Sequence, residues 1–573
     1  MKKLFKHLGK YKLECVLGPL FKLLEACFDL LVPVIMTYLI DEGINKNNVP
    51  FILKMGGVLL ALAVVGYISC ITAQYFCAKA ATGFSASVRQ ELYEKMEKLS
   101  FSSLDELGQS TLMTRLTSDI QTLQNGVNLA LRLFLRSPFI ILGAAIMATL
   151  VSKSWLVGVI FAGVIIVAFI LVFAIMLWTI PKYKHVQSNV DEVVKLTREN
   201  LTGVRVVRAF SKEDLSIQNY NNKNDLLAKV QIKVARISKL LNPIAYGVVN
   251  LSIAGLLYVG ANFIDKGILL QGALIAVINY MSQVVVELIK FADLTIQVTR
   301  AIASGDRVEA MLETIEDPSL NVSVDEHINA PYIYFKDVNF GYTKNGDNAL
   351  NNINLSINKG EVIGVIGGTG SGKSTLISLL AGFYLPSSGE LIIDGKHIEN
   401  YSRKEIRSKT SVVMQKPQLF KGSIKDNMLV ANKDATDEEI YRALEISQSK
   451  EFVMSKEGQL DFVIEQGARN LSGGQKQRLG IARGILANGE ILVLDDSSSA
   501  LDYATEAKLR KEIFAMQNKT IFLVSQRSST VRNADKIIVL DHGTLVGFDT
   551  HENLMKTSLI YEEIVKSQER SEE

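Results

Sequence analysis

The sequence predicts an α-helical membrane domain with six spans, followed by an α/β P-loop domain. The 573 residues are 48% hydrophobic and have a mean hydropathy of +0.20, which is too apolar for a soluble protein of this size. The long apolar runs all lie before residue 300, and a phosphate-binding glycine motif lies after it. We therefore expect a membrane domain at residues 1–300, a linker at 301–331 and a second domain at 332–573.

The clearest predicted span runs from Trp155 to Trp178 and contains no charged residue. A tryptophan at each end can lie at the two membrane interfaces, and the run is long enough to cross a bilayer. Five more runs are predicted spans with looser limits, at residues 15–40, 51–77, 129–151, 241–263 and 268–288.

The orientation follows from the positive charges. Six spans place both termini on the same side of the membrane. Lysine and arginine collect in the N-terminal segment and in the long connections at residues 78–126 and 181–239. By the positive-inside rule these parts are cytoplasmic.

The long connections have helical periodicity and are too long for simple loops. We expect helices that project into the cytoplasm, each pair joined by a short crossing helix. The expected crossing points are GQSTLMTRLTSDIQ, which begins at Gly108, and ENLTGVRVVRAFSKED, which begins at Glu199.

Three charged residues interrupt the first predicted span. Lys22, Glu25 and Asp29 are spaced to share one helix face. Charges inside a membrane usually face a cavity or one another. The sequence leaves three interpretations open: a local ion pair, the lining of a substrate path, or a misplaced span boundary.

A phosphate-binding loop is the strongest motif in the second half. In EVIGVIGGTGSGKSTLISLL a buried strand, Val362–Ile366, leads into a glycine-rich loop and then a helix. Backbone N–H groups of such a loop cradle phosphate, while its lysine reaches the β- and γ-phosphates and its serine contacts Mg²⁺. The predicted nucleotide-binding residues are Gly367, Thr369, Gly370, Ser371, Gly372, Lys373, Ser374 and Thr375.

A second strand, in EILVLDD, ends in two acids. Asp495 is placed to bind the magnesium ion, and Asp496 lies beside the γ-phosphate. These two motifs fit many P-loop enzymes. Between them lies NLSGGQKQRLGIARGIL, which begins at Asn470.

The run LSGGQ, Leu471 to Gln475, resembles the signature motif of ATP-binding cassette (ABC) proteins, and nearly the whole chain is similar to the six-helix (type IV) ABC exporters. The resemblance implies an α/β P-loop ATPase domain with a helical signature subdomain, and ATP and Mg²⁺ as cofactors. In that family two cassettes meet head to tail, and each ATP lies between the P-loop of one and the signature of the other. The residues implied to cap the partner's ATP are Ser472, Gly473, Gly474 and Gln475.

The resemblance assigns roles to further residues. Tyr342 would stack on adenine, with a core tyrosine as the alternative. Gln415 would contact Mg²⁺ or water, which gives Ser374, Gln415 and Asp495 as the metal set. Asp502 would belong to the turn Ser499–Asp502 at the dimer seam, and the crossing helices would be coupling helices that rest on the cassettes.

Two positions depart from the family pattern, and we predict that both weaken catalysis. Asp496 stands where a catalytic glutamate is usual, and Gln526 where a histidine is usual. The aspartate head is held back by one C–C bond, about 1 Å, and a misplacement of this size can cost about 10²-fold in rate. Glutamine cannot carry a proton as histidine does. The alternative is that Asp496 is a tolerated variant in an enzyme that is still competent in ATP hydrolysis.

These observations predict a subunit of an ATP-driven exporter with a degenerate ATP site of its own. Its LSGGQ would complete the catalytic site of a second half-transporter chain, in a heterodimer in a bacterial cytoplasmic membrane with the nucleotide-binding domain in the cytosol. The alternatives are a slow homodimeric exporter or lipid flippase, and an ATP-gated regulator or sensor with little transport.

An amphipathic substrate is expected, which leaves drug, lipid and peptide open. The small net charge of +3 does not favour a nucleic-acid partner. Aromatic residues in the last two predicted spans either contact this substrate or serve packing and interface roles. They are Tyr246, Tyr258, Phe263 and Tyr280.

Overall fold

The computed structural model divides the chain into two compact units. A helical unit comprises Met1–Glu94 and Ser110–Glu313, and an α/β unit comprises Lys95–Gln109 and Thr314–Glu573. The structure describes residues 3–266, 269–317, 326, 328–343, 346–497, 501–516 and 519–572.

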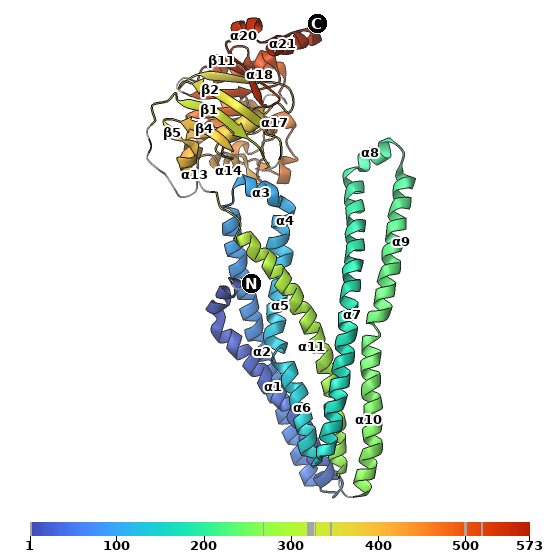
Figure 1. Ribbon diagram of the computed structural model, residues 1–573. Coiled ribbons are helices and arrows are strands. Elements are labelled where there is room, and N and C mark those ends of the chain that lie inside the picture. Colours follow the sequence, from blue (N-terminus) through green and yellow to red (C-terminus); the bar gives the residue numbers. More distant parts are fainter. Residues whose placement is uncertain are drawn as a thin grey trace. The chain divides into compact units, whose positions relative to one another are not determined.

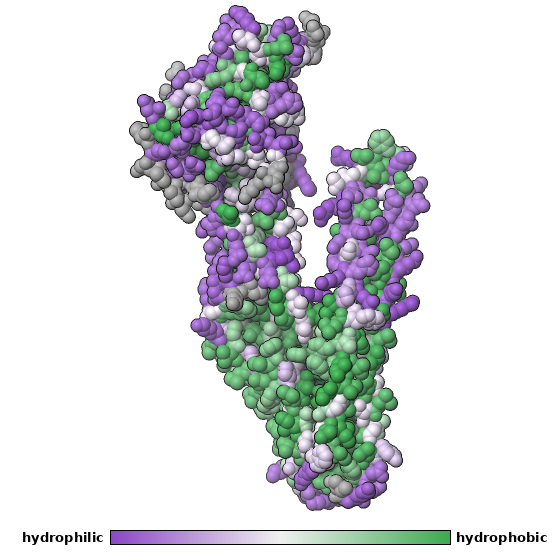
Figure 2. Space-filling model, in the orientation of Figure 1, coloured by the Kyte–Doolittle hydropathy of each residue, from purple (hydrophilic) through white to green (hydrophobic). Residues whose placement is uncertain are grey.

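Among the described residues, six helical segments are long and apolar enough to cross a membrane. Each of the six predicted spans overlaps one of them, so the predicted number is confirmed (Figure 1). Figure 2 shows hydrophobic side chains covering the middle of this unit. The segments are Leu4–Ile44, Val49–Met96, Gln109–Ser152, Trp155–Thr202, Tyr246–Asp265 and Gln271–Leu312.

The chain builds these segments from helices of different length. The bounds are η1 Leu4–Tyr11, α1 Lys12–Tyr38, η2 Leu39–Ile44, α2 Val49–Met96, α4 Gln109–Thr114, η3 Arg115–Asp119, α5 Ile120–Leu133, α6 Arg136–Ser152, α7 Trp155–Thr202, α8 Val204–Ala209, α9 Glu213–Ser238, α10 Leu241–Asp265 and α11 Gln271–Leu312. The segment predicted as a linker therefore begins with the end of α11.

Helix α11 is the central helix of the unit. In its most apolar stretch 61% of the residues are buried, whereas none is buried in that of α2, as expected of a helix that faces lipid. Tyr280 of α11 is fully buried, and its hydroxyl donates to the carbonyl of Leu30 at 2.6 Å. Of the two roles open for this aromatic residue, the structure shows packing.

The position of the first crossing helix was predicted wrongly. The crossing helix is α3, Phe101–Leu107, which ends where the prediction began. Gly108 follows it with φ +71°, and a glycine in this conformation terminates a helix because its backbone turns the chain away. The second crossing helix is α8, which lies inside the predicted segment at the tip of α7 and α9 (Figure 1).

A network of charged side chains lies between α1, α6 and α11. Arg136 begins α6, and its side chain is only 10% exposed. The guanidinium donates to Glu287 of α11 at 2.6 Å and to Asp29 of α1 at 2.9 Å. Ser137 donates to the second oxygen of Glu287 at 2.9 Å, so this buried carboxylate has both of its oxygens paired.

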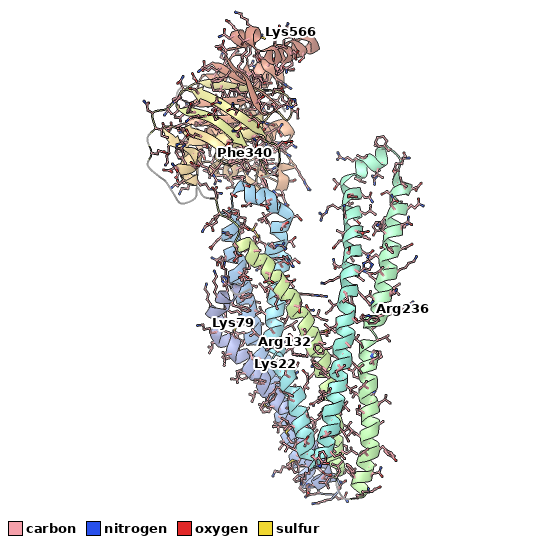
Figure 3. The ribbon with its side chains drawn as sticks, in the orientation of Figure 1. Lys22, Lys79, Arg132, Arg236, Phe340 and Lys566 are labelled. Carbon is pink, nitrogen blue, oxygen red and sulfur yellow. The ribbon has the colours of Figure 1, made fainter. Side chains whose placement is uncertain are left out.

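The other charges of the first span join the same network. The ammonium of Lys22, labelled in Figure 3, lies 2.5 Å from a carboxylate oxygen of Glu25. Glu25 is in turn 3.7 Å from Arg136. The local ion pair that the sequence left open is therefore present for Lys22 and Glu25, whereas Asp29 pairs with a different helix.

The α/β unit contains two larger sheets. The antiparallel sheet has the order β2-β1-β4-β5, and the mostly parallel sheet has the order β12-β11-β3-β10-β9-β6. Their bounds are β1 Ile333–Phe340, β2 Leu350–Ile357, β3 Val362–Ile366, β4 Ser388–Ile393, β5 Lys396–His397, β6 Thr410–Val413, β9 Ile491–Asp495, β10 Thr520–Val524, β11 Lys536–Asp541 and β12 Thr544–Asp549.

Helices surround these sheets and also form a subdomain with its own apolar core. The subdomain contains α14 Ile424–Leu429, α15 Asp437–Ile446, α16 Lys450–Met454 and α17 Gly473–Leu486, together with the short strands β7 Gly422–Ser423 and β8 Val463–Ile464. The remaining helices are α12 Lys373–Leu380, α13 Arg403–Lys409, α18 Tyr503–Phe514, α19 Ser528–Val531, α20 His551–Thr557 and α21 Leu559–Glu572.

We expect Arg136→Met to destabilise the protein, because it leaves Glu287 buried with its main counter-charge removed. Breaking such a pair costs about 3–5 kcal/mol in proteins. The measurement is the Tm of the purified protein in detergent. Lys46→Met is the matched control, because Lys46 forms an ion pair but has a 62% exposed side chain. Equal Tm values for the two variants would contradict the prediction.

Candidate functional site

Three parallel strands bring the predicted catalytic segments to one edge of the large sheet. β10 pairs with β3 on one side and with β9 on the other. Parallel strands end at the same edge, where ligands bind in open α/β sheets. Gly367 follows β3, Asp496 follows β9 and Gln526 is two residues beyond β10, so segments far apart in the sequence lie side by side.

The loop after β3 has the backbone of a phosphate cradle. Gly370 and Gly372 have φ of +81° and +98°, which side chains rarely tolerate. A Cβ on Gly372 would lie 2.9 Å from the carbonyl oxygen of Ala349. Helix α12 begins at Lys373, so its unpaired first-turn N–H groups point toward the loop and favour an anion there.

Lys373 and Asp495 supply the charges of this site. The ammonium of Lys373 donates to the carbonyls of Gly367 at 2.9 Å and Gly368 at 2.7 Å. Burial lowers the pKa of Lys373, while the nearby Asp495 and Asp496 carboxylates oppose this shift. Burial also raises the pKa of Asp495.

Two of the three predicted metal ligands, Ser374 and Asp495, lie near one another. The Ser374 hydroxyl donates to Asp495 at 3.4 Å, which gives two hard oxygen ligands of the kind that Mg²⁺ uses together with substrate phosphates. These residues therefore fit a nucleotide-bound Mg²⁺ ion. The ion would neutralise phosphate charge at this edge.

Asp496 lies beside Gln415, as the sequence assignments imply. The amide nitrogen of Gln415 donates to Asp496 Oδ2 at 3.0 Å, and the backbone N–H of Asp496 donates to the carbonyl of Val524 at 2.9 Å. Asp496 has φ +43°, a conformation that a short acidic residue tolerates better than most residues.

The C-terminal helix holds the segment that contains Gln526. Gln568 of α21 donates to the backbone carbonyl of Gln526 at 2.7 Å. Its side-chain oxygen accepts from the N–H of Ser528 at 2.7 Å and from the hydroxyl at 3.0 Å. Sequence reasoning missed this contact, because the two segments are 42 residues apart and no motif includes Gln568.

The predicted adenine platform belongs to an aromatic cluster. Tyr342 is 51% exposed, which leaves a ring face accessible. Its ring meets Phe340 and Tyr384 edge to face at 5.0 Å and 5.4 Å between centroids, and its hydroxyl lies 3.1 Å from that of Thr375. Sequence reasoning missed Tyr384, although the pair Phe383–Tyr384 directly after the P-loop helix is an aromatic signal.

The first crossing helix contacts the same cluster within the α/β unit. Phe101 of α3 packs on Phe383, with ring centroids 4.7 Å apart, and Tyr384 donates a hydrogen bond to Asp105 of α3. Burial raises the pKa of Tyr384, so the hydroxyl remains a donor. A short chain of contacts thus joins the Tyr342 ring to α3.

The signature segment caps its own helix. Ser472 precedes α17, its hydroxyl accepts from the N–H of Gln475, and the Gln475 side chain accepts from the N–H of Ser472. Gly473 and Gly474 occupy the first turn, where N–H groups lack helical partners. For the described residues, no hydrogen bond joins Ser472–Gln475 to the loop at Gly367–Thr375. The structure does not bring these two predicted halves together within one chain.

Asp502 is the N-cap of α18. It accepts from the N–H of Thr505 at 2.9 Å, and this backbone hydrogen bond is the main cause of its lowered pKa. Ser499 and Ala500, which belong to the same predicted turn, lie outside the described residues.

Comparison with known proteins yields two family matches. The profile of the ABC transporter transmembrane region matches residues 15–288, and the ABC transporter profile matches residues 350–499. The chain is 31% identical to the uncharacterized ABC transporter ATP-binding protein YfiB of Bacillus subtilis, over 99% of this chain and 98% of that one.

The chain is also similar to a relative with a named activity and to a solved structure. The ATP-dependent lipid A-core flippase of Pasteurella multocida is 26% identical, over 98% of this chain and 97% of the flippase. A solved structure of a bacterial Atm1-family ABC exporter with ATP bound superposes with a TM-score of 0.79 at 20% identity, and covers 97% of this chain and 98% of that one. The second similarity shows a shared fold.

We expect Tyr342→Ala to weaken ATP binding about tenfold or more, because an aromatic platform contributes about 1–3 kcal/mol per stacked base. Tyr342→Phe is the matched control, since it retains the ring and removes only the contact with Thr375. The measurement is equilibrium binding of a fluorescent ATP analogue. An alanine variant that binds as tightly as the phenylalanine variant would show that Tyr342 is a core residue only.

Proposed function

Because the chain belongs to the ABC transporter family, we propose that it is the weakly hydrolysing subunit of a heterodimeric ATP-driven exporter. ABC exporters function as dimers in the membrane, and the six spans make this chain an integral membrane protein. The observation that carries the proposal is the contrast between a complete set of ATP-binding groups and a shortened catalytic acid in the same site.

The binding half of the site has the groups that ATP requires. The loop at Gly367–Thr375 offers backbone N–H groups, and Lys373 carries the positive charge. The Tyr342 side chain lies beside this loop, in contact with Thr375. Ser374 and Asp495 are placed to hold Mg²⁺ with the β- and γ-phosphates. We expect this subunit to bind ATP firmly.

The hydrolytic half of the site is weak for two reasons. Asp496 is one methylene shorter than glutamate, and one of its oxygens already accepts a hydrogen bond from Gln415. General-base assistance contributes about 10²- to 10⁴-fold to a rate. A displaced base therefore loses much of this rate enhancement. Gln526 can hydrogen-bond a γ-phosphate but cannot relay a proton. The two losses affect one step and are not additive.

The signature gives this subunit a catalytic role in the dimer. Ser472, Gly473 and Gly474 form a preorganised helix start, where phosphate binds through backbone N–H groups. A partner chain that carries the usual glutamate and histidine gains a complete site when this cap closes on its ATP. Most hydrolysis would then take place at the partner's P-loop.

ATP binding would draw the two cassettes together and change the exposure of the membrane cavity, and hydrolysis would reset the pair. The α/β unit and both termini would lie in the cytosol of a bacterium, and the substrate would be an amphipathic drug, lipid or peptide. A second candidate is a homodimeric lipid flippase, which the similarity to the lipid A-core flippase favours.

The first test restores the missing groups. We expect Asp496→Glu with Gln526→His to raise the ATPase rate of the chain expressed alone by about 10²-fold, because both usual side chains return to one site. The control is the same double variant with Lys373→Met, which removes the phosphate-binding charge. Brisk ATPase activity of the unaltered chain alone would contradict the weak-site proposal.

The second test separates the two roles within the pair. The chain is co-expressed with a half-transporter chain that carries the usual glutamate and histidine, and steady-state ATPase activity is measured. Ser472→Arg should remove most activity, because a large cation crowds the partner's γ-phosphate. Asp496→Asn should cost much less, because it alters only the weak site. The reverse order of effects would refute the assignment.

A further inference from the structure

One face of α11 carries polar side chains although the helix crosses the membrane. The exposed polar residues recur along this face at intervals of three to eight positions, and the exposed Val286 lies in the longest interval. Together these residues form a stripe along the helix. The polar residues are Asn279, Ser282, Lys290, Asp293 and Gln297. The hydrocarbon core is about 30 Å thick, or about 20 helical residues, so Asn279, Ser282 and Lys290 fall within it when the span begins at Gln271.

This polar face does not suit contact with lipid chains. The exposed side chains of α2 show what such contact selects, since they include Leu53, Leu60, Val64 and Ile71. Polar residues inside a membrane face a water-filled cavity or one another. The outer face of α11 therefore meets water or a polar ligand.

The charge network ends at this face. It contains three cations and three carboxylates: Lys22, Arg136, Lys290, Glu25, Asp29 and Glu287. The formal charges cancel. Lys290 contacts Glu287 at 2.9 Å and thereby joins the stripe on α11 to the buried Arg136.

Two members of the network differ from the rest in exposure. The side chains of Asp29 and Lys290 are each 44% exposed, whereas those of the other four are at most 14% exposed. Among the residues that the structure describes, Lys290 makes one of its three possible donations, to Glu287, and Asp29 Oδ2 accepts from Arg136. Both groups can accept a ligand partner while their bonds to the network persist.

We propose that Asp29 and Lys290 are the two polar anchors of a substrate site for a zwitterionic amphiphile, with Asp29 receiving its cationic group and Lys290 its anionic group. The inference rests on the proposed export function and specifies its substrate class. The two most exposed members of the network, Asp29 and Lys290, have opposite charges, and the network is neutral as a whole. A ligand with a single charge would add a net charge to this neutral network at a depth where charge is costly.

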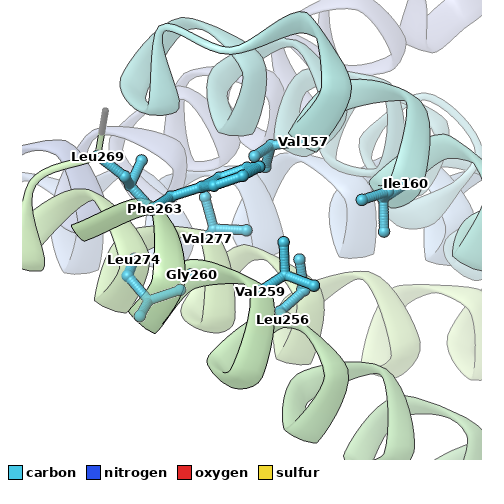
Figure 4. Close-up of a pocket in the computed structure, with 9 residues that line it drawn as sticks. All are labelled: Val157, Ile160, Leu256, Val259, Gly260, Phe263, Leu269, Leu274 and Val277. Carbon is cyan, nitrogen blue, oxygen red and sulfur yellow. The ribbon is translucent and has the colours of Figure 1, made fainter. Parts of the chain in front are cut away.

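The apolar cavity between α7, α10 and α11 is not an alternative site. Its lining is wholly apolar, including Val157, Leu256 and Phe263 (Figure 4). Its volume is about 10 Å³, which is the room of at most one water molecule. Phe263 therefore has a packing role, and this cavity is too small to hold an amphipathic substrate.

The test compares three probes that share one alkyl chain: an alkylphosphocholine, an alkyltrimethylammonium and an alkyl sulfate. Equilibrium binding to the full-length protein, alone and with its partner chain, is measured with radiolabelled probes in non-ionic detergent without ATP. We expect the zwitterion to bind about tenfold more tightly than either single-charge probe, the effect of one charge-assisted hydrogen bond. Because no hydrolysis is involved, this result is independent of the weak-site proposal.

Substitutions of Asp29 and Lys290 test the role of each anchor in binding. Asp29→Asn and Lys290→Gln should each reduce zwitterion binding about tenfold, while Asp29→Glu and Lys290→Arg should retain it. The matched controls are Glu42→Gln and Lys46→Gln, which alter an exposed ion pair elsewhere in the helical unit. Size-exclusion elution verifies that each variant is folded and assembled.

Three outcomes would overturn the proposal: equal binding of the cation and the zwitterion, unchanged binding in both anchor variants, or variants that change only the assembly of two chains. Movement of a fluorescent phosphatidylcholine in reconstituted vesicles would identify the zwitterion as a bilayer lipid. Its absence, with phosphocholine binding retained, would identify a ligand taken from solution.

Discussion

The parallel pairing of β3, β10 and β9 is the constraint on which the nucleotide site depends. Every residue of these three strands is buried, so the strands cannot slip without exposing apolar surface. Their common edge places the glycine loop, Asp495, Asp496 and the segment of Gln526 together. Side chains then act from a backbone that is already fixed, which is the general requirement for precise electrostatic catalysis.

The contacts of α3 extend this fixed frame within the α/β unit. Arg403 donates to the backbone carbonyls of Glu97 and Leu99 and to Asp317. Together with Phe101 and Asp105 on the aromatic cluster, these contacts hold α3 against the side of the domain that carries Tyr342. A shift of the Tyr342 ring would therefore reach α3 through packed side chains, and chains of packed side chains can carry conformational coupling.

Local patterns predicted most of the fold and the loop chemistry, because they depend on neighbours in sequence. The apolar spans, the P-loop and the acids after β9 are of this kind. Contacts between distant segments were not predictable in this way. The bond from Gln568 to Gln526 and the pairing of Arg136 with Glu287 depend on tertiary packing. The misplaced crossing helix shows a second limit, since Gly108 fits both the start and the end of a helix.

The signature segment explains why a subunit with a short acid remains useful to a dimer. Ser472 and Gln475 satisfy each other's hydrogen bonds within the chain, so the cap is formed before any phosphate arrives. The first-turn N–H groups of Gly473 and Gly474 remain available, and binding needs little reorganisation. This preorganisation does not depend on Asp496, because it is local to α17. A short acid on one surface of the domain and a preformed helix cap on another are therefore physically compatible in one chain.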